Sequence, residues 1–131
     1  MFISSNILPI TYGLFFRHVQ SVSVQGYLKC NDKPATDITV KLYDKDTFTF
    51  DDLMAKGKTD SNGYFKLSGS EKEMTKIDPE LVIHNSCGSK LGKFSMKRIK
   101  VTIPKSYITN GPIPSKVFDI GTMELAGKIK T

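Results

Sequence analysis

The sequence of 131 residues has few of the side chains that carry chemistry. It contains two histidines, His18 and His84, and their spacing does not suit a metal site. Glycine-rich phosphate loops and Ser/His/Asp arrangements are absent as well. A general base and an electrostatic stabiliser cannot be assembled from what remains. We therefore predict that the protein is not an enzyme and needs no cofactor.

Long apolar runs are also lacking, since no stretch reaches the ~18 apolar residues of a membrane-spanning helix. The segment from Ile7 to Phe16 is mostly apolar, but Pro9 interrupts it. It has neither the basic start nor the A-x-A cleavage site of a secretory signal. We interpret residues 1–20 as a weak signal peptide or a misassigned gene start, in preference to a loose tail. Residues 21–131 are then expected to form one domain.

Negative charge is scarce in the last third of the chain. Residues 1–87 carry 10 basic and 11 acidic groups, a net charge of −1, whereas residues 88–131 carry 9 and 2, a net charge of +7. The sum is the formal net charge of +6. This asymmetry favours an anionic partner or surface. An ordinary solvated basic edge is the alternative.

Apolar and polar residues alternate in several short segments, which is typical of half-buried strands. In Ser21–Cys30, for example, Val22, Val24 and Leu28 share one face. Further strands are expected at 38–44, before and after a turn at Asn62-Gly63, and at 81–87, 94–103 and 117–125, with a bulge at Gly121. About seven short strands without a long helix predict an all-β sandwich.

The stretch Asp51–Gly69 is central to this prediction, because it is expected to contain a helical turn, a strand, a tight turn and a second strand. Asp51 and Asp52 are expected to open a short helical turn through Met54, because carboxylates suit a helix N-terminus. Asn62-Gly63 is expected to form a two-residue hairpin turn, which requires positive φ. Gly69–Pro79 is rich in charge and is expected to be an exposed loop.

The two cysteines, Cys30 and Cys87, each lie at the end of a predicted strand and on its apolar side. Both thiols should therefore enter the core at one end of the sandwich. This arrangement favours a disulfide, which would contribute ~4 kcal/mol in the chain-entropy model. Two buried free thiols are the alternative.

Ordered motifs run through most of Ser21–Leu125, including Val24-x-Gly26-x-Leu28-x-Cys30, Gly63-x-Phe65-x-Leu67-x-Gly69, Glu73-x-Thr75-x-Ile77-Asp78-Pro79 and Ile83-x-Asn85-x-Cys87. On these motifs the sequence resembles the nematode transthyretin-like family of small secreted proteins. The resemblance implies a transthyretin-like (prealbumin-like) β-sandwich and an extracellular address. Two departures are that Asn85 stands where many members have histidine, and that a second cysteine pair is lacking.

The transthyretin fold also hosts hydroxyisourate hydrolases, which end in a Tyr-Arg-Gly-Ser motif. This chain ends Gly127-Lys128-Ile129-Lys130-Thr131, and His84 is expected to be an ordinary outward or half-buried strand residue. A calcium loop is conceivable among acidic residues. Turn and helix-start roles explain these residues better, so we predict no metal site at Asp44, Asp46, Asp51, Asp52 and Asp60.

The basic set of the last third gives the candidate site. Arg98 and Lys100 are expected to share an outward strand face with Phe94 and Met96, and Lys97 lies beside them. Cations next to apolar residues suit a membrane interface or a protein partner. A charged edge strand that resists aggregation is the alternative.

We therefore expect a secreted, non-enzymatic binding protein that recognises an anionic lipid head group, such as phosphatidylserine, or a cell-surface receptor. The family resemblance permits a bridging role between a dying cell and a phagocyte. An extracellular carrier of a small apolar ligand is the alternative, and a divergent hydrolase is a third hypothesis. Nucleic acid is not expected as a partner, because the sequence has no recognition helix.

Overall fold

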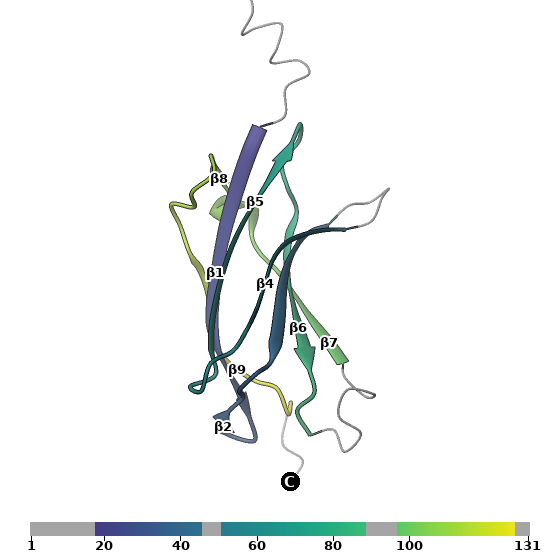
Figure 1. Ribbon diagram of the computed structural model, residues 1–131, viewed down its shortest axis with the longest axis vertical. Helices are drawn as coiled ribbons and strands as arrows, with labels where there is room; N and C mark the ends of the chain where they lie inside the picture. Colours follow the sequence, from purple (N-terminus) through teal and green to yellow (C-terminus); the bar gives the residue numbers. More distant parts are fainter. Residues whose placement is uncertain (1–17, 46–50, 89–96, 128–131) are drawn as a thin grey trace, which may run out of the picture.

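The computed structural model describes residues 18–45, 51–88 and 97–127 (Figure 1). Two sheets pack face to face, and they form the all-β sandwich that the sequence predicts. One sheet, called sheet A, is built around β1 and contains β1 (His18–Cys30), β2 (Lys33–Pro34), β5 (Tyr64–Glu73), β8 (Thr109–Asn110) and β9 (Phe118–Glu124). The other, sheet B, has the order β4 (Asp52–Lys58), β3 (Thr39–Asp44), β6 (Pro79–Asn85), β7 (Lys97–Thr102).

The long strand β1 holds sheet A together. It pairs antiparallel with β5 from His18 opposite Glu73 to Tyr27 opposite Tyr64, and it pairs parallel with β9. The register with β9 shifts by one residue between Gln25 and Tyr27. Gly121, with φ of 74°, lies in this irregularity. The bulge predicted at Gly121 is therefore confirmed.

The core lies between the sheets and is made of the residues whose alternation predicted it. Val22, Val24 and Leu28 of β1 are fully buried, as are Val40 and Leu42 of β3 and Leu81 and Ile83 of β6. Phe65, Leu67 and Ile103 are no more than 7% exposed. Each such side chain contributes roughly 1.5–3 kcal/mol by leaving water, so this layer supplies most of the driving force for folding.

The helical turn predicted at Asp51–Met54 is wrong, because Asp52–Lys58 forms β4. The pairing of β4 with β3 slips between Leu42 and Tyr43, where Ala55 and Leu53 are the partners and Met54 is the extra residue. This extra residue interrupts the alternation, so the segment does not look like a strand in the sequence. The helical turn in the described residues is instead a 3-10 turn at Lys105–Tyr107, directly after Pro104.

The expected loop at Gly69–Pro79 is also partly wrong, because β5 continues to Glu73. Its charged residues alternate like those of an edge strand, with Glu71 and Glu73 half-buried and Lys72 exposed. Charge on a strand edge is a common protection against aggregation, and it hides the strand from a reading of composition.

The turn at Asn62-Gly63 exists, but it joins the two sheets instead of making a hairpin within one sheet. The Gly63 N–H donates to the Asp60 carbonyl over 2.9 Å, and the Asp60 N–H donates to the Tyr64 carbonyl over 2.9 Å. Gly63 has φ of 78°, whereas Asn62 does not have the positive φ expected for it. The Asp60 carboxylate accepts from the N–H groups of Asn62 and Tyr64, which is the turn role expected for this residue.

Candidate cationic binding face

A disulfide joins Cys30 to Cys87 and confirms the predicted pairing. The two Cα atoms are 5.7 Å apart, and both residues pack against the core. The bond links the end of β1 in one sheet to the residues after β6 in the other. Asn85 braces the same end, because its side chain donates to the Leu125 carbonyl and accepts from the Cys87 N–H, each over 2.9 Å. One end of the sandwich is therefore closed covalently.

The outward face of sheet B carries five cations from three strands, which we call the cationic face: Lys41, Lys56, Lys58, Arg98 and Lys100. Lys56 of β4 is opposite Lys41 of β3, Lys41 is opposite Val82 of β6, and Val82 is opposite Lys100 of β7. These pairings form one row across all four strands. Since neighbouring strands lie about 4.8 Å apart, the row brings residues far apart in the chain close together.

A second row lies two residues further along the same strands, on the same side of the sheet. Lys58 is opposite Thr39, and His84 is opposite Arg98. Because Val40 pairs with Ile83, Thr39 and His84 follow on the same side of the sheet. The cationic face therefore has two parallel rows of positive charge that span the sheet from β4 to β7.

Burial confirms which way these strands face. Lys56, Lys58, Arg98 and Lys100 are exposed, whereas Ile99 and Val101 between the cations of β7 are partly buried and pack on the core. Val82 points outward but is only 4% exposed. We attribute its burial to the long aliphatic stems of its register neighbours Lys41 and Lys100, which keep their charged ends in water.

His84 lies within the cationic face and is half-buried, as expected. Its Nε2 atom is buried and has no hydrogen-bond partner in the described chain. Burial lowers the pKa of His84 below its usual value, and the positive charges of Lys41, Arg98 and Lys56 lower it further. These neighbours do not provide the acceptor that would orient a general base. The lowered pKa of His84 reflects its burial first and the positive charges of the cationic face second.

The candidate residues of the sequence analysis fall into three groups. Arg98 and Lys100 lie on the cationic face, pointing away from Ile99 as expected. Lys97 is opposite Asn85 and has the parity of Ile99, so it lies at the start of β7 and off this face. Phe94 and Met96 lie outside the described residues.

Sequence reasoning missed Lys41, Lys56 and Lys58. Their segment has a net charge near zero, because Asp44 and Asp52 on the same strands, with Asp46 and Asp51 between them, offset the lysines. The alternation of residues along its strand predicted that Lys41 points outward. The position of β3 between β4 and β6, which brings these lysines near β7, depends on non-local strand pairing and could not be predicted from the local sequence.

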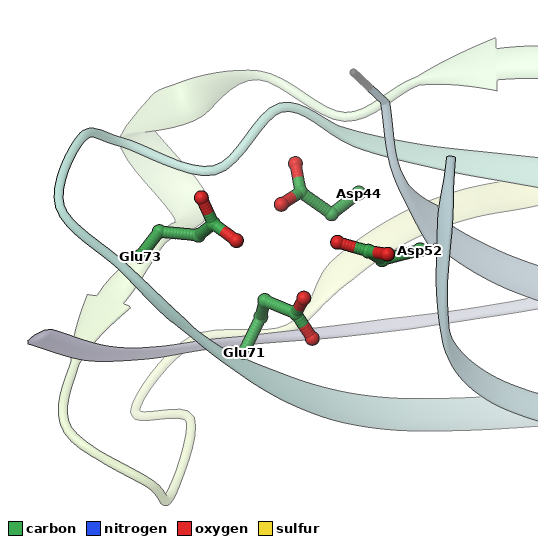
Figure 2. A group of neighbouring side chains, drawn as sticks. All are labelled: Asp44, Asp52, Glu71 and Glu73. Atoms are coloured by element: carbon green, nitrogen blue, oxygen red, sulfur yellow. The ribbon is translucent and has the colours of Figure 1, made fainter. Parts of the chain in front are cut away.

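Four carboxylates meet where β5 passes the edge of sheet B, and Figure 2 shows them pointing toward one another. They belong to Asp44, Asp52, Glu71 and Glu73, and one oxygen from each lies within 4.8 Å of the oxygens that the others offer. Burial, followed by a hydrogen bond and repulsion from Asp52, raises the pKa of Glu71 to about 7. The Asp44 carboxylate also accepts from the Asp78 N–H over 2.8 Å.

This acidic cluster contains two of the five residues considered for calcium, Asp44 and Asp52, while Asp60 serves the turn. Asp46 lies outside the described residues. Glu71 and Glu73 were missed because their segment was expected to be a loop. The oxygens are of the kind that a divalent cation prefers. A proton held by Glu71 relieves the same repulsion, so the cluster has an explanation without a metal.

The fold and the disulfide together define a transthyretin-like sandwich. The chain matches the model of the Transthyretin-like family over residues 25–104 and belongs to that family.

Three similar proteins are all from Caenorhabditis elegans. Transthyretin-like protein 5 is 45% identical over 84% of this chain and 79% of its own length. Transthyretin-like protein 46 is 42% identical over 81% of this chain and 60% of its own length. Transthyretin-like protein 2 is 43% identical over 87% of this chain and 80% of its own length. These names state a family and no reaction.

One observation bears on where the protein works. Disulfides persist in oxidising compartments, and the Cys30–Cys87 bond fits such a place. In the described ranges, none of the helices has the length and apolar character needed to cross a bilayer.

Proposed function

We propose that the protein is secreted and acts as a non-enzymatic binding protein, which attaches to an anionic component of a cell surface through the cationic face. The observation that carries this proposal is the gathering of five cations from β3, β4 and β7 on one side of sheet B. Charge of one sign concentrated on one face steers and holds an anionic partner.

The cations of this face are available to a partner. In residues 18–45, 51–88 and 97–127, the salt bridges join Lys29 to Asp32 and Lys45 to Glu80. None of the five cations takes part in them. Each basic group near an anionic surface contributes about 1 kcal/mol, so five are sufficient for measurable recruitment.

The test is binding of labelled protein to intact cells at physiological salt. A cationic-face variant replaces four exposed residues: Lys56→Gln, Lys58→Gln, Arg98→Gln and Lys100→Gln. A matched control removes the same charge elsewhere on the surface: Lys33→Gln, Lys66→Gln, Lys72→Gln and Lys76→Gln. We expect the first variant to lose binding and the control to keep it. Equal binding by both variants would contradict the proposal.

A lipid head group and a protein receptor are the two partners that the family resemblance suggests. Flotation with vesicles of phosphatidylserine, phosphatidylinositol or neutral lipid tests the lipid. Preference for phosphatidylserine at physiological salt would support a bridging role. Binding to every anionic lipid that fades with salt would reduce the effect to nonspecific charge.

The carrier hypothesis makes a separate prediction. A small apolar ligand should raise the melting temperature, and the protein should form a tetramer in solution. Neither result is expected if the cationic face accounts for the function.

A further inference from the structure

Resting on the proposed function, we infer that the partner of the cationic face is a linear sulfated polysaccharide of the cell surface. The inference concerns only the chemistry of the partner, so it can fail while the proposed function stands. It follows from three properties of the face: the direction of its charge rows, the absence of exposed large apolar side chains from these rows in the described residues, and the position of half-buried His84 among the cations.

The rows of charge run across the strands and reach both edges of sheet B. Lys56 and Lys58 belong to β4, and Arg98 and Lys100 belong to β7, which are the outer strands of this sheet. Lys41 lies between them, opposite Lys56. A linear polyanion that crosses the strands can meet all of these cations at once and extend past either edge. A single small anion could contact only a part of the face.

Two rows also suit the distribution of charge on such a polymer. Residues two apart on a strand are separated by about 6.6 Å, so the rows containing Lys56 and Lys58 lie about that far apart. Sulfated polysaccharides carry sulfates on both sides of the chain. A chain lying between the rows can therefore present anions to each of them.

Among the described residues, the two cationic rows contain no exposed large apolar side chain of the kind that favours a membrane. Binding to a bilayer gains strength from apolar side chains that enter the interface. Among the described residues, the exposed large apolar side chains are Tyr27, Leu53, Met74, Ile113 and Val117. Only Leu53 belongs to sheet B, and it lies opposite Tyr43, beyond the two cationic rows. In this described part of the face, rows of charge without exposed large apolar side chains favour a polyanion over a lipid surface.

His84 adds an electrostatic reason for an anion on this face, because the cations Lys41, Arg98 and Lys56 surround its half-buried ring. A sulfate between Arg98 and Lys41 would offset the positive charges around the imidazole ring.

The test uses heparin as the probe, at about 0.15 M salt. We expect a size-defined heparin fragment to bind the wild-type protein, and N- and O-desulfated heparin, which keeps the carboxylates, to bind much more weakly. Affinity should fall linearly with salt on logarithmic axes, as polyelectrolyte binding does. The cationic-face variant should lose about 100-fold in affinity, and the matched control should stay within about twofold of the wild type.

Folding is checked by the melting temperature, and the substituted residues of both variants are exposed. Equal losses by the two variants would overturn the inference, because net charge alone would then explain binding. Undiminished binding of desulfated heparin would also overturn it.

The cellular counterpart separates the two proposals. If enzymatic removal of sulfated polysaccharides abolishes the binding of wild-type protein to cells, the inference is supported. If binding persists and still depends on the cationic face, the inference fails and the proposed function stands. Binding to phosphatidylserine vesicles without binding to heparin leads to the same conclusion. No face-dependent binding to cells, heparin or vesicles would overturn both.

Discussion

Glu71 illustrates at the residue scale how a packed carboxylate costs stability. Burial and the nearby Asp52, Asp44 and Glu73 raise its pKa from 4.5 to about 7. Between pH 4.5 and about 7, Glu71 therefore keeps its proton in the folded state but has released it in the unfolded state. This contribution to stability is fully present below pH 4.5 and is lost as the pH rises through about 7.

We predict that Glu71→Gln, which resembles the protonated side chain, raises the melting temperature at pH 8 and has little effect near pH 5. His84, whose pKa is lowered, contributes with the opposite sign below pH 6.5, so only the difference between variant and wild type isolates Glu71. Thermal melts at both pH values make the measurement, with Asp32→Asn as an exposed control. A lower melting temperature for Glu71→Gln at pH 8 would contradict this account.

His84 should make the cationic face sensitive to pH. The charged groups around it are Lys41 on β3, Lys56 and Lys58 on β4, and Arg98 and Lys100 on β7. A bound polyanion offsets their repulsion and favours protonated His84. We predict that heparin binds more tightly at pH 5.5 than at pH 7.5, by up to about tenfold. Titrations of the His84→Gln variant should show no such change, and an unchanged pH dependence would exclude His84 as the cause.

Gly63 shows how one turn residue serves two elements. Its φ is 78°, and an added Cβ would collide with the carbonyl oxygen of Leu28. The Gly63 carbonyl also accepts from the Leu28 N–H over 2.8 Å, which ties the turn to β1. The turn between the sheets is therefore fixed both by its own backbone and by its contact with β1.

We predict that Gly63→Ala lowers the free energy of unfolding by about 2 kcal/mol or more. Gly88→Ala is the matched control, because Gly88 has φ of 77° but no atom of the described residues lies within 4 Å of an added Cβ. It should cost about 1 kcal/mol, the penalty for the backbone alone. Urea denaturation compares the two variants. Equal losses would show that contact with Leu28 is unimportant.

The disulfide acts at the scale of elements by holding the end of β1 to the residues after β6. Cys30 and Cys87 are 57 residues apart in the sequence, so the bond closes a long loop in the unfolded chain. We predict that the double variant Cys30→Ala/Cys87→Ala loses about 4 kcal/mol of stability. Urea denaturation under non-reducing conditions tests this. Unchanged stability, or two titratable thiols in the purified denatured protein, would contradict the account.

Most of the sandwich could be predicted because strands buried on one face alternate with period two. The inward residues of β1, β3 and β6 followed from this rule. The later part of β4 was expected as the strand before the turn at Asn62-Gly63. Its start was missed because Met54 is an extra residue at a bulge, and the end of β5 was missed because its charges resemble those of a loop. Both misses occur where local composition and tertiary pairing disagree.

The candidate site was predictable only in part, because it depends on the order of strands in the whole molecule. The half on β7 was visible as an excess of basic residues in the last third of the chain. The half on β3 and β4 became visible only when Lys41 and Lys56 were placed in one row with Lys100. Charge averaged along a sequence does not report charge gathered on one face.

The central claim is that the cationic face of sheet B is the binding surface. Backbone amide shifts of the isotope-labelled protein, recorded while a short heparin fragment is added, test it most directly. We predict that the largest changes fall on β3, β4, β6 and β7, around Lys41, His84 and Arg98, with little change on β5. Changes centred on β5, or spread evenly over both sheets, would contradict the claim.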